Sequence, residues 1–245
     1  MKKGQPQQQN SGTRLNKFIA HAGVCSRREA DMHIQLGSVK VNNKVMTELG
    51  YKVQSTDVVH FDGQRLQAEK PTYILLNKPK GFITTTRDEK GRKTVMDLIA
   101  NATKARVVPV GRLDRPTTGL LLFTNNGEMA KKLTHPKSGI KKLYHVVLDK
   151  AVKGQHLSDI KNGVKLDDGS IQADEVSYVQ GASKREVGIL LHSGRNRIVR
   201  RIFTHLGYEV ISLDRVMFAG LTKKDLPRGH WRHLTQTEIQ QLNML

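Results

Sequence analysis

The sequence has few acidic residues and one cysteine, and each shortage excludes a class of protein. Its 245 residues contain 22 Asp and Glu against 41 Lys and Arg, for a formal net charge of +19. This excess is unusual for an enzyme of small neutral substrates and favours a polyanionic partner. Cys25 has no second cysteine to pair with, so a disulfide-rich secreted domain is excluded and a reducing cytoplasm is expected.

Long apolar runs and clusters of metal ligands are also missing. We find neither an apolar span or secretory signal nor a basic amphipathic anchor, so nucleic acid is a better candidate partner than an anionic membrane. His230 and His233 are three residues apart, but no cysteine and no third ligand accompany them, so no metal site is expected. No GxGxxG or Walker loop opens a helix, so no nucleotide cofactor is expected.

The length predicts one small domain and one larger domain. Residues 1–13 lack periodic apolar positions and are predicted to be a disordered basic tail. Residues 14–62 read as a small module in which a helix containing Leu15 and Phe18 precedes a second helix capped by Ser26 and Glu29. Strands follow at 38–42 and 57–61, and a polar linker is predicted at 63–71.

Residues 72–245 mix strand-like and helical segments. Helices are predicted at 94–101, 128–134 and 196–206, and a last helix at 236–242 begins with a capping box of Thr235 and Glu238. The two kinds of segment do not alternate regularly, so the fold class is predicted to be α+β rather than a doubly wound sheet. Apolar runs predict strands at 73–76, 106–110, 120–123, 144–148 and 187–191.

Basic and polar residues recur in a fixed order through the small module: Arg14, Lys17, Ser26, Arg27 and Arg28. A helix beginning at Ser26 would add its positive dipole end to two guanidinium groups, which is typical of a phosphate site, although a solvated charged face would look the same. The stretches RLNKFIA, SRR and GSVKVNN resemble the S4 RNA-binding domain from Arg14 to about Asp62, with Asn16 where that family often carries Asp. This resemblance implies RNA binding and not catalysis.

In the larger domain, Asp114 stands between two basic residues in a turn-prone segment that precedes an apolar run. Arg112 and Arg115 would favour its ionised form, and Pro116 and Gly119 would shape the turn. A charged carboxylate in a turn can serve as a nucleophile or a base. An aspartate that merely starts the turn by accepting backbone hydrogen bonds explains the pattern equally well.

The segment 111–127, GRLDRPTTGLLLFTNNG, resembles the catalytic signature of the RsuA and RluB type of pseudouridine synthases. The stretches LLNKPKG, KKLYHV, SGRNRIVRR and LPRGHWRHL resemble the same family in the same order, and together they cover nearly everything after Thr13. The form of SGRNRIVRR, together with the S4-like module, favours the RluB branch, which acts on large-subunit ribosomal RNA. The resemblance implies a mixed, mainly antiparallel central sheet and no cofactor.

The resemblance also implies roles for individual residues. Asp114 would be the essential carboxylate, acting either as a nucleophile at C1′ of the ribose or as a base at the 2′ position, and both alternatives stay open. Tyr144 would stack on the uracil with its hydroxyl near the C5 proton, although a core strand tyrosine fits the pattern too. Arg200 would pair with Asp114, and Val199 would line the uracil pocket.

Other basic residues are predicted to contact RNA. Arg195, Arg197 and Arg201 lie in a run with no acidic residue between 187 and 208, so they are expected to bind phosphate groups. A solvated helix face is the alternative. The same interpretation extends to the basic residues beside the two turns, Lys78, Lys80, Arg112 and Arg115.

Taken together, these patterns predict a ribosomal RNA pseudouridine synthase that is monomeric and uses no cofactor. Its predicted partner is 23S rRNA or an assembling ribosomal particle, and 16S rRNA is an alternative substrate. A non-catalytic S4-containing assembly factor is the main rival, but an aspartate among arginines would weaken its hold on a polyanion. A DNA-binding protein is disfavoured because no helix-turn-helix, zinc finger or basic zipper is found.

Overall fold

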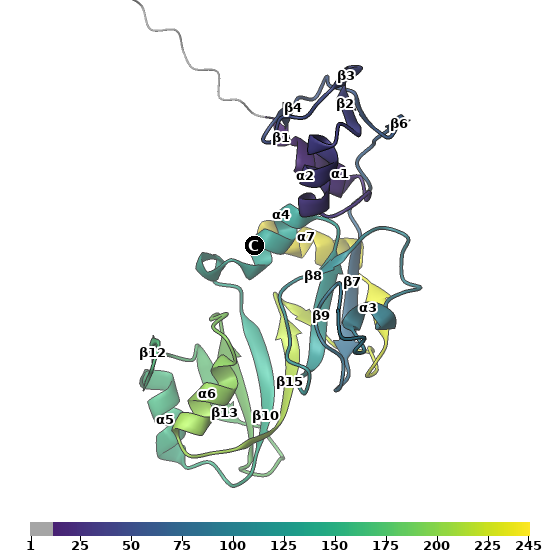
Figure 1. Cartoon of the computed structure of the whole chain (residues 1–245). Coiled ribbons are helices and arrows are strands. Elements are labelled where there is room, and N and C mark those ends of the chain that lie inside the picture. Colours follow the sequence, from purple (N-terminus) through teal and green to yellow (C-terminus); the bar gives the residue numbers. More distant parts are fainter. Residues whose placement is uncertain (1–11) are drawn as a thin grey trace, which may run out of the picture. The chain divides into compact units, whose positions relative to one another are not determined.

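A computed structural model of the chain describes residues 12–245 (Figure 1). The disordered basic tail predicted for residues 1–13 lies outside the described residues, apart from Gly12 and Thr13. Contacts between residues divide the chain into two compact units, the first ending at Pro71 and the second running from Thr72 to Leu245. Each unit has a hydrophobic core of its own. No helix within residues 12–245 has the length and apolarity needed to cross a bilayer.

The first unit opens with the two predicted helices, α1 (Leu15–His21) and α2 (Arg27–Gln35). Apolar side chains from both helices are buried in one cluster with residues of the following strands. The predicted capping box is present: Ser26 Oγ accepts a hydrogen bond from the Glu29 amide at 3.2 Å, and the Glu29 carboxylate accepts one from the Ser26 amide at 2.7 Å. These bonds satisfy two amides that a helix start leaves without partners.

Short strands complete the first unit. Four of them form a sheet in the order β3-β2-β5-β6, and β1 pairs with β4. Asp62 and Gly63 both have positive φ, 45° and 82°, as a tight two-residue hairpin turn requires. The resulting β6 falls inside the segment predicted as a linker, and Thr13 pairs with Val53, so strands extend beyond 14–62 at both ends. The strands are β1 (Thr13–Arg14), β2 (Val39–Val41), β3 (Lys44–Val45), β4 (Lys52–Val53), β5 (Val59–Phe61) and β6 (Gln64–Arg65).

Nine strands of the described part of the second unit form one sheet. Seven follow the order β13-β14-β10-β15-β9-β7-β17, while β16 pairs with β15 and β8 with β9. The β15–β9 pairing is parallel and the other ladders are antiparallel, so the predicted mixed, mainly antiparallel sheet is confirmed. The strands of this unit are β7 (Tyr73–Lys78), β8 (Val108–Pro109), β9 (Thr118–Thr124), β10 (Lys142–Leu148), β11 (Val164–Leu166), β12 (Gly169–Ile171), β13 (Glu175–Tyr178), β14 (Glu186–Leu191), β15 (Val210–Phe218), β16 (Leu221–Thr222) and β17 (Trp231–His233).

Helices cover both parts of this sheet (Figure 1). Side chains of α5 and α6 pack on the part around β10 and β14, and those of α4 and α7 pack on the part around β7 and β9. The predicted helix at 196–206 begins later because Arg197 is left-handed, with φ of 48°. The predicted capping box of Thr235 and Glu238 is confirmed. The helices are α3 (Val95–Leu98), α4 (Gly127–Thr134), the 3-10 helix η1 (Pro136–Ser138), α5 (Gly154–Asn162), α6 (Ile198–His205) and α7 (Gln236–Met244).

The parallel pairing of β15 with β9 is the seam between two halves of the sheet, β13-β14-β10-β15 and β9-β7-β17. Its ladder joins Asp214 to Thr118 and Arg215 to Gly119. Gly119 has a φ of 105°, and a Cβ on it would lie 2.2 Å from the carbonyl oxygen of Arg215. A residue with a side chain does not fit there, so the glycine lets the two strands approach. The loop before β9 is thereby brought beside β10 and β15.

Candidate active site

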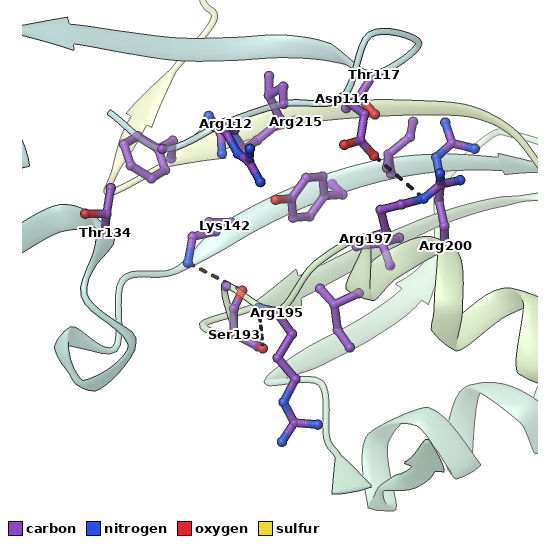
Figure 2. A pocket seen from close by; sticks show the side chains of 18 of the residues that line it. Arg112, Asp114, Thr117, Thr134, Lys142, Ser193, Arg195, Arg197, Arg200 and Arg215 are labelled. Atoms are coloured by element: carbon purple, nitrogen blue, oxygen red, sulfur yellow. Dashed lines mark hydrogen bonds and ion pairs between the residues drawn. The ribbon is translucent and has the colours of Figure 1, made fainter. Parts of the chain in front are cut away.

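A cavity of about 170 Å³ opens where that loop faces the other half of the sheet. This volume is below the roughly 300–1,000 Å³ of pockets that enclose a drug-sized ligand, so it suits one small ring. Figure 2 shows the basic side chains that gather around it together with Asp114. Its lining comes from the Asp114 loop, from β10 and β15, and from the turn into α6, and includes Arg112, Asp114, Thr117, Lys142, Tyr144, Ser193, Arg195, Arg197, Val199, Arg200, Leu213, Arg215 and Phe218.

Hydrogen bonds from Thr84, outside the loop, and from within the loop itself hold Asp114 in place. The Thr84 hydroxyl donates to the carbonyl of Leu113 at 2.7 Å and accepts from its amide at 3.2 Å. The amide of Thr117 donates to the carbonyl of Asp114 at 3.0 Å, which closes a turn around Pro116. The Asp114 side chain is 41% exposed and faces the cavity, so it is accessible to a ligand.

Lys78 lies beneath this loop, and its position differs from the prediction. It was expected to contact phosphate, but it is the buried last residue of β7, with 0% exposure. Its ammonium donates to the carbonyls of Asp114 at 3.2 Å and Thr117 at 2.8 Å, and also to those of Pro79 and Arg115. Burial lowers the pKa of Lys78 to about 8, and the nearby Asp114 acts in the opposite direction. Lys78 therefore organises the Asp114 turn and is not available to RNA.

The ion pair of Asp114 also differs from the prediction. Its carboxylate lies 3.9 Å from Nε of Arg197, a residue predicted to bind phosphate. Arg200, the predicted partner, instead donates from Nη1 to the carbonyl of Val210 at 3.0 Å. Burial, and after it the charge of Arg197, lower the pKa of Arg200, whereas Asp114 raises it. Arg200 thus acts on Asp114 through its charge, and the left-handed backbone of Arg197 carries the closer guanidinium to the carboxylate.

Tyr144 and Val199 both line the cavity. Tyr144 is half-buried in β10, where it lies opposite Ile189 of β14 and Arg215 of β15. Val199, in the first turn of α6, is 3% exposed. The structure thus brings together four of the residues proposed from sequence for the chemistry and the base pocket, Asp114, Tyr144, Val199 and Arg200.

Three predicted RNA contacts lie around the Asp114 loop with exposed side chains: Lys80, Arg112 and Arg115. Arg112 lines the cavity. Nε of Arg115 donates to the carbonyl of Gly81 at 3.2 Å, and the amide of Gly81 donates back to the carbonyl of Arg115 at 2.9 Å. Arg115 therefore fastens the NKPKG turn to the Asp114 turn, and the rest of its guanidinium stays open to solvent.

Two of the three arginines around α6 meet acidic partners that the sequence argument did not consider. Arg201 is bonded to Asp167 and to Asp168, the latter at 2.6 Å, and Arg195 lies 3.4 Å from Asp168. These aspartates form the turn between β11 and β12, more than twenty residues away along the chain. The run itself holds no acidic residue, but the fold brings acidic partners to Arg195 and Arg201 from outside it, and their predicted contact with phosphate stays a prediction.

In the first unit, Arg14, Arg27 and Arg28 are exposed, and Lys17 and Ser26 are half-buried. Arg14 precedes α1, and the other two arginines begin α2. Because the Ser26 hydroxyl and the Glu29 carboxylate cap α2, a carboxylate already occupies its amino end. This reduces the case for a phosphate on the helix dipole, while the guanidinium groups of Arg27 and Arg28 stay accessible.

Five polar residues of the cavity were missed: Thr117, Thr134, Lys142, Ser193 and Arg215. Lys142 is held by the carbonyls of Ile140 and His192, each at 3.0 Å, and burial followed by the charge of Arg215 lowers its pKa to about 8. Lys142 precedes Tyr144 by two residues on the same strand, so strand alternation puts both on one face. The sequence also contained an indication for Arg215, because a charged residue inside an apolar strand is rare unless it is paired or functional.

The described residues contain no group of three or more His, Cys, Asp and Glu side chains that could hold a metal ion. His230 and His233, the spaced pair of the sequence, make separate contacts: His230 with the Arg228 carbonyl at 3.3 Å and His233 with the Ala102 carbonyl at 3.1 Å. The cavity therefore offers a carboxylate, a tyrosine and several cations as its chemical groups.

Comparison with known proteins places both units in families. Residues 72–205 match the family described as RNA pseudouridylate synthase, and residues 13–59 match the S4 domain. The chain is 43% identical over 95% of its length to the ribosomal large subunit pseudouridine synthase B of Bacillus subtilis, of which it covers 96%. It is 36% identical over 94% of its length to the dual-specificity RNA pseudouridine synthase RluF of Escherichia coli, of which it covers 78%.

A solved structure supports the same grouping. The chain matches a structure described as a pseudouridylate synthase with a TM-score of 0.67 and 28% identity. The match covers 94% of this chain and 99% of that one, so it extends over both units.

Proposed function

Because this chain belongs to the RNA pseudouridylate synthase family and carries an S4 domain, we propose that it isomerises a uridine of large-subunit ribosomal RNA with Asp114 acting at the ribose. The observation that carries the proposal is the place of Asp114, a carboxylate half-open to a small cavity that Tyr144 and Val199 also line. The large-subunit substrate rests on the name of the Bacillus subtilis relative.

The reaction breaks the bond between N1 and C1′, turns the uracil, and joins C5 to C1′. Atoms and oxidation state are the same before and after, so the chemistry calls for a group at the sugar and a way to move one proton, and for no redox partner. Asp114 would either attack C1′ or remove the 2′ hydrogen, and the geometry supports both alternatives. Lys78 and Thr84 would fix the carboxylate for this step by holding the backbone on both sides of it.

Tyr144 is suited to act on the base. Its ring faces the cavity from β10, so it can stack on the uracil, and its hydroxyl can receive or relay the proton that leaves C5. The apolar wall formed by Val199 and Leu213 would complete a slot for a flat ring. A base that fills this slot would exclude water, so water could not attack C1′ after the N1–C1′ bond breaks. The uracil would then be rejoined to the sugar and not lost.

Arg197 and Arg200 place positive charge beside Asp114 while the substrate is absent. The 3.9 Å ion pair with Arg197 is long and partly exposed, so it contributes little stability and can open without a large loss. A bound ribose would take the place of this contact. Arg197 would then be free to meet a flanking phosphate, while the half-buried Arg200 stays to balance the charge of Asp114.

A uridine stacked in RNA must be turned out of its helix before Asp114 can reach its sugar. Extruding a base costs roughly a few kcal/mol. Exposed basic residues on each unit could offset that cost through phosphate contacts, Arg27 and Arg28 on the S4 unit and Lys80 and Arg112 on the catalytic unit. We therefore assign the S4 unit to substrate capture.

Tritium release tests this function directly. Wild type and Asp114→Asn are incubated with large-subunit rRNA labelled with tritium at uracil C5, as transcript and as assembling particle, and with small-subunit rRNA labelled in the same way. RNA retention on filters is followed in parallel. Wild type is expected to release tritium, because the label leaves when the C5 bond to the sugar forms. Asp114→Asn should bind RNA equally well and release none.

A matched control variant tests whether the loss of activity is specific to the carboxylate of Asp114 or follows from replacing any aspartate. Asp159→Asn, whose side chain accepts a hydrogen bond from Gln155 on α5, should keep wild-type activity. Binding without release by wild type on every large-subunit substrate would contradict the proposal and favour a non-catalytic assembly factor. Release from small-subunit rRNA alone would contradict the choice of subunit and leave the reaction intact.

A further inference from the structure

Arg215 is a buried cation in the lining of the cavity, and the proposed function has not used it. It is 3% exposed, and it lies in β15 directly opposite Tyr144 of β10 and beside Gly119 of β9. Direct neighbours across a ladder point to the same face of a sheet, so the guanidinium and the tyrosine ring share the cavity wall.

The guanidinium of Arg215 lacks some of the hydrogen-bond acceptors and the anion that a buried charge needs. Nε donates to the carbonyl of Leu120 at 2.8 Å, and the guanidinium lies over the Phe218 ring at 4.6 Å. Its Nη2 is buried and donates to no acceptor among residues 12–245, and none of their carboxylates forms an ion pair with it. Burial lowers the pKa of Arg215, and the Tyr144 hydroxyl is the group that acts in the opposite direction.

A buried guanidinium without a carboxylate partner needs a reason. Desolvating a guanidinium costs several kcal/mol unless an anion or a full set of hydrogen bonds compensates. The neighbouring carboxylate cannot help, because Asp214 is bonded to Thr118 at 2.6 Å, to Arg228 at 2.8 Å and to Lys223. The unused Nη2 therefore points to a ligand that brings its own negative charge or a strong acceptor.

The burial of Arg215 indicates which part of the substrate it would contact. The exposed arginines at the rim, such as Arg112 and Arg197, are the ones that phosphate groups can reach. Figure 2 shows the pair of Asp114 and Arg197 at one end of the labelled side chains and Lys142 toward the other. A ribose held at Asp114 would send its base inward, past Tyr144 and toward Arg215.

Resting on the proposed function, we propose that Arg215 is a further catalytic residue, which binds a carbonyl oxygen of the uracil and stabilises the uracil anion between detachment and reattachment. When the bond between N1 and C1′ breaks, its electron pair stays on N1, and the negative charge spreads to the carbonyl oxygens of the ring. At the sugar, either an ester forms between Asp114 and C1′, or Asp114 takes the 2′ hydrogen and a double bond forms between C1′ and C2′.

Reattachment removes the negative charge from the uracil. The C5 atom of the anion bonds to C1′. At the sugar, either the ester bond breaks and its electron pair returns to Asp114, or the pair of the C1′–C2′ double bond re-forms the C2′–H bond with the proton that Asp114 gives back. The C5 proton then moves to N1. Arg215 holds a fixed charge throughout and exchanges no proton. Lys142, whose ammonium bonds the carbonyls of Ile140 and His192, adds positive potential behind it.

The leaving ability of the base provides the test. The full-length protein is used in single turnover on large-subunit rRNA transcripts that carry uridine or 5-fluorouridine, and loss of the target nucleoside is measured by mass spectrometry after digestion. Fluorine withdraws electrons and stabilises the departing anion without help from the protein. We expect Arg215→Met to lower the rate on uridine by about 10²–10³-fold, the effect of removing one preorganised donor. The loss on 5-fluorouridine should be at least about tenfold smaller.

Control variants keep this test decisive. Arg215→Lys retains a charge but loses the planar fork, so it should show a smaller loss with the same preference for 5-fluorouridine, and it replaces Arg215→Met if that variant does not fold. Arg232→Met removes an arginine that is paired with Glu238 outside the cavity, and it should affect both RNAs equally. Equal losses on both RNAs in the Arg215 variants, or no loss, would overturn the inference. A wild type that binds both RNAs and converts neither would instead refute the proposed function.

Discussion

At the scale of single residues, Lys78 shows how a charge can serve a site without touching the substrate. Its three N–H donors converge on carbonyls of the NKPKG and Asp114 turns, so one side chain replaces hydrogen bonds that two loops cannot make with each other. Burial lowers its pKa to about 8, which leaves the ammonium mostly charged at neutral pH. Its removal would take the Lys78 donor from the Pro79 and Thr117 carbonyls and leave the Asp114 carbonyl with the Thr117 amide alone.

We expect Lys78→Met to lower kcat far more than RNA affinity. Methionine fills the volume but donates no hydrogen bond, so the Asp114 turn should shift, and a misplacement of about 1 Å can reduce the rate roughly 10²-fold. Loss of the donors should also lower the free energy of unfolding by about 1–3 kcal/mol. Tritium release under saturating RNA, filter binding and urea denaturation measure the three quantities.

Lys80→Met is the matched control, because Lys80 is the exposed lysine two positions on. It should keep kcat and lose a little RNA affinity. The positioning role of Lys78 is wrong if Lys78→Met retains full kcat, or if the two variants behave alike.

Sequence reasoning reached Asp114, Tyr144 and Val199 but misjudged Lys78, and the reason is physical. The first three belong to short motifs whose spacing is visible along the chain, and the cavity contains them all. Whether a lysine is buried depends on strands far apart in sequence, here β7 and β9, so Lys78 and the exposed Lys80 read alike. Arg215 was missed for the same reason, because its burial also depends on contacts between strands far apart in the sequence.

At the scale of elements, the hairpin of β11 and β12 places acidic groups on the arginines of α6. Asp167 and Asp168 form its turn and hold Arg201 and Arg195 where a phosphate would otherwise bind. The bond to Arg201 lowers the pKa of Asp168, so both partners stay charged in any physiological buffer. RNA must displace these carboxylates, or bind beside them.

Replacing both hairpin aspartates by Asn should therefore tighten RNA binding and steepen its dependence on salt. Two released guanidinium groups could each neutralise a phosphate, and every such contact adds about 0.7–0.9 to the slope of log K against log salt concentration. Filter binding between low and moderate salt measures this slope for wild type and for the double variant.

A second double variant, Asp159→Asn with Glu175→Gln, changes the net charge by the same amount at other positions. It should raise affinity less and leave the slope close to that of wild type. Equal slopes for the two double variants would show that the hairpin does not compete with RNA.

Elements with strong local signals were predicted well, and those that depend on distant contacts were not. The helices capped at Ser26 and Thr235 follow from capping boxes that act within four residues. By contrast, α5 has one buried side chain, Ile160, and so little periodic signal, and the β11–β12 turn is defined by its pairing. The predicted strand at 106–110 shrinks to Val108–Pro109 because β8 meets β9 over two residue pairs.

At the scale of the whole catalytic unit, the site spans the seam. Asp114 precedes β9 in one half of the sheet, whereas Tyr144 and Arg215 belong to β10 and β15 in the other. Asp214 ties the halves together, because its carboxylate bonds Thr118 across the ladder and Arg228 from the segment before β17. Burial would raise the pKa of Asp214, but these hydrogen bonds and that of Lys223 lower it to about 2.

Asp214→Asn should consequently destabilise the unit in a manner that depends on pH. With a folded pKa of about 2 against an ordinary 3.8, ionised Asp214 contributes about 2 kcal/mol above pH 4. The sign follows from proton uptake: the unfolded chain binds the proton first, so the contribution disappears as pH falls from about 4 through 2. Urea denaturation of both proteins at pH 6 and pH 2.5 measures it.

For this prediction Asp159→Asn is again the reference, and it should lower stability little at either pH. A gap between wild type and Asp214→Asn that has the same size at pH 6 and pH 2.5 would show that the carboxylate charge is not what ties the halves.

The seam has a consequence for how the protein loses its structure. Its parallel ladder consists of two residue pairs, so the two halves of the sheet share few backbone hydrogen bonds, and we expect the backbone alone to couple their unfolding only weakly. A uracil seated between Asp114 on one side and Tyr144 on the other would add contacts to both halves at once. Substrate RNA would then act as a cross-link in addition to Asp214, and the catalytic unit would melt more cooperatively while it holds the base it is about to turn.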